Sequence, residues 1–250
     1  MAQLFGHEKL TVYRKGMTFA AYRSELLERL TRRVAACDHL DRAAESILVN
    51  IAHASSSWSP KERIVCLGHA NGSALECAAC LDVFVAKELL ASHDVYPGKS
   101  LLSEIVSMLI VLRKTTANRV CEDHALYRTE KGRLFSHEDL DVYQTALRLT
   151  GWVDRLFIAF SCSADLRSKL DTSTTSIVLN LAEGNGRFSG TDQAKFLGIA
   201  YKATIQSATL VELATAKGSA EPSQVEDGLE MIRCIAAMIT SLAKVVSRES

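Results

Sequence analysis

Proline, glycine and aromatic residues are scarce in this sequence. Its 250 residues include 3 prolines and 13 glycines, and only 6% are aromatic. The shortage of proline permits long uninterrupted helices, while alanine, leucine and isoleucine are plentiful. This amino-acid composition disfavours a β-sandwich and favours helices packed on helices. With 48% hydrophobic and 23% charged residues, the chain can bury a core and is not disordered.

An excess of charge of one sign is lacking too. Lys plus Arg and Asp plus Glu each number 29, and residues 1–130 carry 16 basic and 15 acidic side chains. This balance argues against tight, purely electrostatic binding of nucleic acid by the monomer. It leaves open a local basic patch, or a patch that oligomerisation builds.

The sequence shows no signal peptide, no apolar run of membrane-spanning length and no familiar catalytic motif. A Walker loop, a dinucleotide fingerprint, a nucleophile elbow and an HExxH sequence are all missing. The cysteines number 7, and an odd count without a signal peptide suggests reduced thiols. We therefore expect a cytoplasmic protein with no membrane contact, no cofactor, no metal and no small-molecule substrate.

Aligning Asn50 with Asn180 superimposes most of the first half of the chain on the second half. The stretch SIVLNLAEGNGRFS at 176–189 has a weaker copy, SILVNIAHASSSWS, at 46–59, and LFGHEKLTVY at 4–13 matches LFSHEDLDVY at 134–143. Further identities in this alignment need no gap and include Asp41/Asp171, Ile47/Ile177, Leu67/Leu197, Gly68/Gly198, Lys87/Lys217, Ile105/Ile235 and Met108/Met238. Residues that the alignment places opposite each other are called equivalent below. We interpret this self-similarity as a tandem duplication.

Each repeat divides into four segments with helical periodicity, which predicts an all-α fold of two tandem antiparallel four-helix bundles. The first bundle is predicted over residues 1–118 and the second over 134–250, with a polar linker at 119–133. The helices predicted for the first repeat are His7–Cys37, Asp38–Ala54, Pro60–Ser92 and Lys99–Thr115. Those predicted for the second repeat begin near Ser136, Asp165, Ser189 and Ser223.

Helix ends are signalled by capping residues and glycines. Ser59, Ser189 and Ser223 are each predicted to open a helix through a capping box. Gly184 and Gly186 are predicted to stop the second helix of the second repeat, because glycine adopts the left-handed geometry of a helix end at little cost.

Three motifs of the second repeat resemble a known family pattern. Phe135, Asp139, Leu140, Val142 and Tyr143 supply the residues of F-x-D-L-x-V-Y, with two more residues between Phe135 and Asp139 than the pattern has. S-I-x-x-N-I-A-E-G-x-G-R-x-S is matched from Ser176 to Ser189 with Leu181 in place of its second isoleucine, and F-L-x-I-A from Phe196 to Ala200. The family comprises small four-helix-bundle proteins encoded in intervening sequences of bacterial large-subunit rRNA genes. Its superfamily includes the accessory variability determinant protein of diversity-generating retroelements. The resemblance implies no known enzymatic activity, and the retroelement member resembles a ring-forming, basic adaptor for nucleic acid and a reverse transcriptase.

Each repeat keeps a different half of the family pattern. The first repeat keeps G-S-x-x-E as Gly72, Ser73 and Glu76, but shows AHASSS at 52–57 where the family has A-E-G-x-G-R. The second repeat keeps A-E-G-x-G-R and replaces G-S-x-x-E by KATIQ at 202–206. Our hypothesis is complementary loss, in which a surface once shared between identical subunits is now divided between two unlike repeats.

The candidate structural residues of this pattern are Asn50, Glu76, Asn180, Glu183, Gly184 and Gly186. Asn50 and Asn180 lie among apolar positions, so we expect their amides to bond a neighbouring helix or to cap the corner, with ligand contact as the alternative. Glu183 and Arg187 bracket the glycines. They are expected to form an ion pair that fixes the turn, unless Arg187 binds a phosphate.

Two further groups of side chains have a functional and a structural interpretation. Arg29, Arg32 and Arg33, with Arg187, are the candidate contacts to nucleic acid, although a solvated helix face is the favoured explanation of the first three, because Glu25 and Glu28 lie beside them. An enzymatic or metal-binding role would need Cys77 with Cys80, or His7 with His137. We expect core cysteines and helix-start histidines instead.

The function predicted from these observations is a non-enzymatic adaptor or scaffold. A duplicated subunit suggests an ancestor that formed symmetric oligomers, so we expect a homo-oligomer. The resemblance implies association with RNA or with a nucleic-acid enzyme such as a reverse transcriptase. The alternative is a purely protein-binding helical scaffold with no nucleic-acid contact.

Overall fold

The computed structural model describes residues 6–117, 134–159 and 163–249, and within these ranges it contains eight α-helices, two short 3-10 helices and no strand. The first repeat contains η1 (Gly6–Lys9), α1 (Thr11–Glu28), α2 (Ala35–Ser56), α3 (Pro60–Ala86) and α4 (Ser92–Ala117). The second contains η2 (Ser136–Asp139), α5 (Asp141–Ala159), α6 (Ala164–Asn185), α7 (Gly190–Ala216) and α8 (Pro222–Glu249). The all-α fold is confirmed, and the predicted linker lies outside the described residues.

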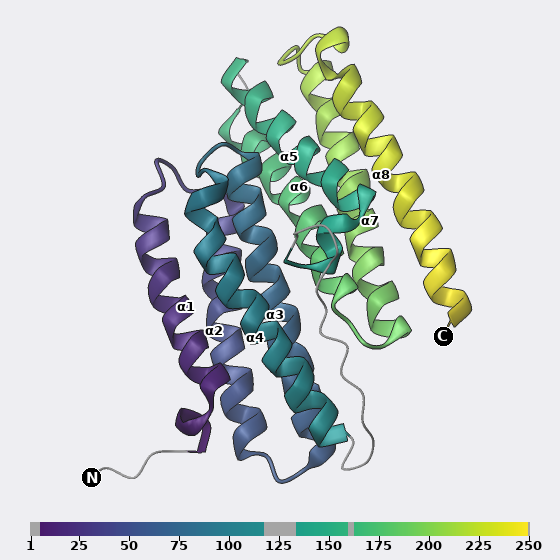
Figure 1. Cartoon of the computed structure of the whole chain (residues 1–250). Coiled ribbons are helices and arrows are strands. Elements are labelled where there is room, and N and C mark those ends of the chain that lie inside the picture. The colour runs from purple at the N-terminus through teal and green to yellow at the C-terminus, as the bar shows by residue number, and fades with distance from the viewer. Residues whose placement is uncertain (1–5, 118–133, 160–162, 250) are drawn as a thin grey trace.

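Each repeat is a four-helix bundle whose consecutive helices pack on one another (Figure 1). In the first bundle α2 packs on α3, α3 on α4, and α1 on both α2 and α4. The second bundle repeats this arrangement, with α6 on α7, α7 on α8, and α5 on both α6 and α8. The same neighbours in the same order are what a duplicated four-helix sequence predicts.

One packing detail shows how closely the bundles correspond. A Cβ on Gly98 of α4 would lie 2.2 Å from Cε1 of Tyr22, and a Cβ on Gly228 of α8 would lie 2.3 Å from Cη2 of Trp152. In both bundles an aromatic ring of the first helix therefore lies directly on a glycine of the fourth. Tyr22 is equivalent to Trp152, and Gly98 is equivalent to Gly228.

Several predicted helix boundaries in the first repeat were wrong. α1 ends at Glu28, and Cys37 belongs to α2 rather than to the first helix. The predicted helix Pro60–Ser92 ends early at Ala86, and α4 starts at Ser92 with Pro97 inside it. The chain leaves α3 at Glu88, whose φ is 56°. Glutamate rarely adopts this left-handed conformation, so its presence in the sequence does not indicate that a helix ends there. The end of α3 could therefore not be predicted.

The predicted caps were partly right. Ser59 Oγ accepts a hydrogen bond from the Glu62 amide at 3.4 Å, which confirms the cap of α3. Ser189 makes no side-chain cap bond. α8 starts at Pro222, one residue before the predicted Ser223, and Gln224 Oε1 accepts from the Glu221 amide at 2.7 Å. Residues 136–139 form the separate turn η2 instead of opening α5.

The prediction that α6 ends at the glycines was right in position, because Gly186 is its C-cap, but wrong in the left-handed geometry. α6 continues through Gly184 to Asn185, and Gly186 has a φ of −84°. These glycines allow close approach instead. A Cβ on Gly184 would lie 3.0 Å from Phe196 Cβ, and a Cβ on Gly186 would lie 1.8 Å from Leu75 Cδ1 in the other repeat.

Two helices pass a test of length and apolar composition for a membrane span, namely α3 and α4. This differs from the expectation that no apolar run reaches that length. The apolar window of α3 is 67% buried inside the protein, as in the core helix of a bundle, whereas that of α4 is 28% buried.

Candidate interaction surfaces

The two bundles contact each other through different faces. The first repeat contributes α2 and α3, and the second contributes α5 and α6, which correspond to α1 and α2 (Figure 1). In the described ranges neither α7 nor α8 packs on a helix of the first repeat. This contact, here called the junction, is therefore head-to-tail rather than two-fold symmetric.

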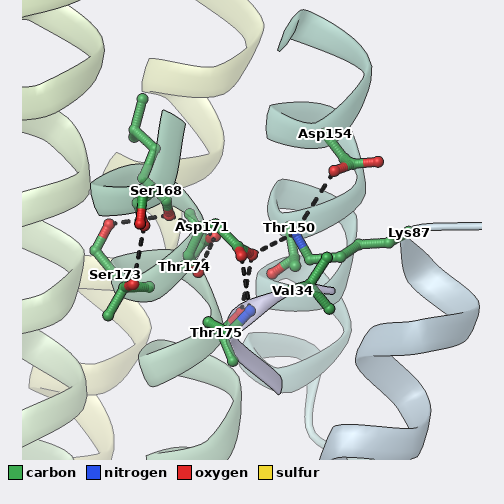
Figure 2. Close-up of polar contacts among 12 residues, drawn as sticks. Val34, Lys87, Thr150, Asp154, Ser168, Asp171, Ser173, Thr174 and Thr175 are labelled. Atoms are coloured by element: carbon green, nitrogen blue, oxygen red, sulfur yellow. Dashed lines mark hydrogen bonds and ion pairs between the residues drawn. The ribbon is translucent and has the colours of Figure 1, made fainter. Parts of the chain in front are cut away.

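A buried lysine lies at one end of the junction (Figure 2). The Lys87 side chain is 1% exposed, and its Nζ lies 2.8 Å from Asp171 Oδ1 and 3.8 Å from Asp154 Oδ1. Asp154 also pairs with Arg32. Both aspartates belong to the second repeat, whereas Lys87 and Arg32 belong to the first. A buried cation is tolerated only with such partners, so this cluster ties the two repeats together.

Asp171 also caps a helix of the other repeat. Ala35 is the first residue of α2, and its amide donates a hydrogen bond to Asp171 Oδ2 at 2.8 Å. The preceding residue, Val34, has no side-chain oxygen that could accept this bond. α6 of the second repeat is self-capped, because Ser163 Oγ accepts from the Leu166 amide at 3.3 Å. The first repeat therefore takes part of its helix capping from the second.

A second polar cluster lies earlier on α3, at Asp82. Tyr143 donates its hydroxyl hydrogen to Asp82 Oδ2 at 2.8 Å, and Lys99 Nζ lies 2.6 Å from Asp82 Oδ1. Lys99 also pairs with Glu138 of η2. Burial raises the pKa of Asp82, with Lys99 opposing the shift. Burial would lower the pKa of Lys99, but the carboxylates of Asp82 and Glu138 outweigh it and raise that pKa.

The retained halves of the family pattern meet at the other end of the junction. Asn71 Nδ2 donates to the Gly186 carbonyl at 3.1 Å. A Cβ on Gly72 would lie 2.9 Å from an Arg187 guanidinium nitrogen and 3.0 Å from Glu183 Oε1, so the ion pair of the second repeat lies directly on this glycine. G-S-x-x-E of the first repeat thus faces A-E-G-x-G-R of the second, as expected if the two halves belong to one contact.

Glu183 and Arg187 form the expected ion pair across one helical turn. The Arg187 guanidinium also lies over the Phe196 ring, with 4.5 Å from its central carbon to the ring centroid. Burial raises the pKa of Glu183; Arg187 opposes the shift, and the nearby Glu76 carboxylate adds to it. Glu76 itself is held by His39 Nδ1 at 3.0 Å.

Every arginine predicted to contact nucleic acid has a carboxylate partner. Arg29 pairs with Asp94, Arg32 with Asp154, Arg33 with Asp38 at 3.1 Å, and Arg187 with Glu183. The structure does not bring Arg187 to the other three. Each of these charges thus has an opposite charge beside it, although the exposed pairs of Arg29 and Arg33 are individually weak.

The paired asparagines bond within their own helices, which corrects the expectation of a bond to a neighbouring helix or corner. Asn50 Nδ2 donates to the Ser46 carbonyl at 2.9 Å, and Asn180 Nδ2 donates to the Ser176 carbonyl at 2.7 Å. Both amides also reach the hydroxyl of the same serine at 3.1 Å. The identical geometry in both repeats supports a structural role.

The repeated histidines each pack against a tyrosine. The ring centroids of His7 and Tyr13, and those of His137 and Tyr143, lie 4.7 Å apart at 65°. His137 is fully buried, and burial, followed by the charge of Lys99, lowers its pKa to about 3. Among the described residues its ring nitrogens have no hydrogen-bond partner.

The Cys77 and Cys80 thiols lie in the core, as expected. Both residues are 0% exposed, and burial raises the pKa of each thiol well above its usual value. Within the described ranges no three His, Cys, Asp or Glu side chains gather in an arrangement that could hold a metal ion.

The face of α7 that corresponds to the junction face of α3 is open. Asn71, Leu75 and Val83 of α3 are 3%, 6% and 0% exposed. Their equivalents on α7 are Tyr201, Ile205 and Leu213, which are 40%, 46% and 38% exposed. These three residues and Ile199 are called the α7 face below. Sequence reasoning missed this surface, because the same helical pattern describes a covered helix and an open one.

The first repeat leaves the opposite face open. The exposed apolar residues of α1, α2 and the turn after α2 are Met17, Val49 and Trp58, and Trp58 is 98% exposed. Trp58 is equivalent to Phe188, whose ring lies 3.8 Å from the guanidinium carbon of Arg113 across the junction. The open face of α1 and α2 is called the α1/α2 face.

These features define a class of protein: a tandem pair of four-helix bundles joined head to tail through a polar junction. The sequence matches the model of one family, described as 23S rRNA-intervening sequence protein, over residues 8–111 and again over 138–241. The chain belongs to this family as a tandem duplication, since the two matched segments begin and end at equivalent positions. No curated protein and no solved structure matches it.

Proposed function

We propose that this protein is a non-enzymatic helical scaffold that binds another protein through the α7 face. The observation that carries this proposal is the contrast between α3 and α7. On α3 the face is covered by a second bundle, whereas on α7 the same positions hold Tyr201, Ile205 and Leu213 in solvent. Exposed apolar side chains clustered on one helix are typical of a protein-binding surface.

The chemistry of this face favours a protein over a nucleic acid. Apolar side chains at helical spacing fit the apolar stripe of a partner helix. Nucleic acid would be bound chiefly through basic side chains, and the predicted ones, Arg29, Arg32, Arg33 and Arg187, are held in ion pairs. Association with RNA or with a reverse transcriptase stays a prediction that rests on the resemblance.

Site-specific photo-cross-linking in cells of the source organism tests the proposal. A photoreactive residue at Ile205 is expected to yield one discrete protein adduct. The matched control places the same group at Thr240, an exposed position on α8, where no such adduct is expected. The mass of the adduct identifies the partner and distinguishes a second copy from another protein. Equal labelling at both positions, or none at Ile205, contradicts the proposal.

A further inference from the structure

The head-to-tail junction raises the question of whether it repeats from chain to chain. Both sides of the junction have an uncovered counterpart in each chain. The α7 face is the counterpart of the α3 side, and the α1/α2 face is the counterpart of the side formed by α5 and α6. Head-to-tail contacts generate rings or filaments when both faces stay competent. We infer that the α7 face of one chain can no longer bind the α1/α2 face of another chain in this way. The junction therefore forms once, within the chain, and a second copy cannot repeat it.

The first reason is that a side chain now stands where the junction requires glycine. A Cβ on Gly151 would lie 2.3 Å from the carbonyl oxygen of Ala86. The equivalent residue of the α1/α2 face is Ala21, which would meet the backbone oxygen of Ala216 in a second copy. Backbone cannot rotate aside as a side chain can, so the two helices cannot approach to the same distance.

A second close approach is also obstructed, here by side chains rather than by backbone. Gly186 lies against Leu75, and a Cβ on Gly186 would lie 1.8 Å from Leu75 Cδ1. The equivalent pair between chains is Ser56 with Ile205, which adds a side chain to one partner and leaves the other just as large. Only the second repeat therefore has a glycine at this close approach, and the first repeat has a serine there.

The polar partners of the junction are missing as well. Lys87 has two aspartates, Asp154 and Asp171. Its equivalent, Lys217, would meet Ser24 in place of Asp154. The remaining carboxylate, Asp41, is already paired with Arg23 and Arg33. A lysine buried there would lack adequate partners, which strongly opposes the contact.

Two further substitutions on the second repeat have the same effect. Asn71, which donates to the Gly186 carbonyl, is replaced by the larger Tyr201. Lys99, which joins Asp82 to Glu138, is replaced by Leu229. The acidic partner Glu8 on the first repeat would therefore face a leucine, and the second cluster of the junction could not form between chains.

The inference is independent of the proposed function. It excludes a second copy that binds the α7 face through its own α1/α2 face, while the cross-linking experiment asks whether any protein binds there. An absent cross-link at Ile205 would overturn the proposed function and leave this inference intact.

A variant in which the junction residues are restored on both open faces tests the inference directly, because its chains should then associate. The full-length restoring variant carries the junction's own residue at each open position: Ala21→Gly, Ser24→Asp, Ser56→Gly, Tyr201→Asn, Lys202→Gly and Leu229→Lys. Light scattering after size-exclusion chromatography is expected to give the restoring variant a mass that is a multiple of the wild-type mass. A matched control, Ala237→Gly with Ser241→Gly on the exposed side of α8, is expected to keep the wild-type mass.

One further variant keeps the inference falsifiable if the restoring variant folds poorly. Ala21→Arg places a long charged side chain in the centre of the α1/α2 face. A wild-type assembly that Ala21→Arg dissociates would overturn the inference, because that face would then be in use. A wild-type assembly that survives Ala21→Arg uses another surface and supports it. A folded restoring variant with the same mass as the wild type would also overturn it.

Discussion

Glu88 and Gly218 occupy equivalent positions in the two repeats, and both have left-handed backbones with φ of 56° and 69°. Each follows the third helix of its bundle and turns the chain toward the fourth. Glycine adopts this conformation freely, whereas a residue with a Cβ is strained by about 1–2 kcal/mol. The duplicated fold thus requires one backbone geometry that only the second repeat meets without strain.

Glu88→Gly is therefore expected to stabilise the protein. The relief of strain outweighs the extra flexibility of glycine in the unfolded chain, for a net gain of about 1 kcal/mol. The Glu88 carboxylate contributes little, since its 3.5 Å pair with Arg155 is largely exposed. Calorimetry is expected to show a Tm increase of roughly 2–4 °C. Glu88→Ala keeps the Cβ, so an equal increase for that control would contradict the explanation.

Gly186→Ala is expected to destabilise the protein, whereas Gly198→Ala is expected to stabilise it. The new methyl at Gly186 meets Leu75 across the junction, for an overpacking cost of about 1–3 kcal/mol. Nothing lies within 4 Å of a Cβ at Gly198, which is inside α7, so alanine there gains roughly 0.5–1 kcal/mol of helix propensity. Urea unfolding of both variants measures the difference. Destabilisation by both would show that close approach is not the cause.

Asp171→Asn is expected to loosen the junction. It removes the charge that faces buried Lys87 and weakens the acceptor for the Ala35 amide. Breaking a buried ion pair on one side costs about 3–5 kcal/mol. Asp165→Asn is the matched control, because its pair with Lys169 is exposed and worth roughly 0.3–0.5 kcal/mol. Hydrogen exchange is expected to show faster opening at the start of α2 for Asp171→Asn alone, and unchanged exchange there would contradict the cap.

Acid is expected to destabilise the fold through His137. Its folded pKa of about 3 lies below the unfolded value of 6.5, so the unfolded state takes up the proton first. The contribution is complete above the unfolded pKa and is lost as the pH falls toward the folded pKa, by about 1.4 kcal/mol per unit.

The variant His137→Phe isolates this effect. Phenylalanine keeps a ring between Phe135 and Tyr143 and does not titrate. The unfolding free energy of the wild type is expected to fall relative to that of the variant as the pH is lowered from about 6.5 to about 4. The same substitution at His93, whose side chain is 85% exposed, serves as the control. A difference independent of pH would mean that the pKa of His137 is the same in the folded and unfolded states, which would contradict the prediction.

Nucleic-acid binding is expected to be weak and to depend little on the four predicted arginines. Their charges are balanced by carboxylates, so few counterions would be released on binding. Binding to structured RNA and duplex DNA across a salt series, on a sample of known mass, measures this. Tight binding that falls steeply with salt and is lost in Arg33→Ala would instead support the nucleic-acid adaptor predicted from the resemblance.

The sequence by itself determined the helical class, the duplication and its period. Apolar residues at helical spacing, few prolines and a gapless match between the two halves predict two bundles of four helices, and the family match repeats with the same period. The Glu183–Arg187 pair and the buried Cys77 and Cys80 could be predicted too, because each depends only on neighbours within one helix or on burial in a bundle.

Only the tertiary structure decided how the two repeats meet. Gly186 reads as a helix stop, yet its role is set by Leu75 of the other repeat. Asp171 reads as a surface aspartate, yet it caps α2 and neutralises Lys87. Its equivalent, Asp41, pairs with arginines of its own repeat instead. Helical periodicity records which face of a helix is apolar, and it does not record which neighbour covers that face. For that reason α3 and α7 share one sequence pattern, although α3 is covered by the other repeat and the α7 face is open.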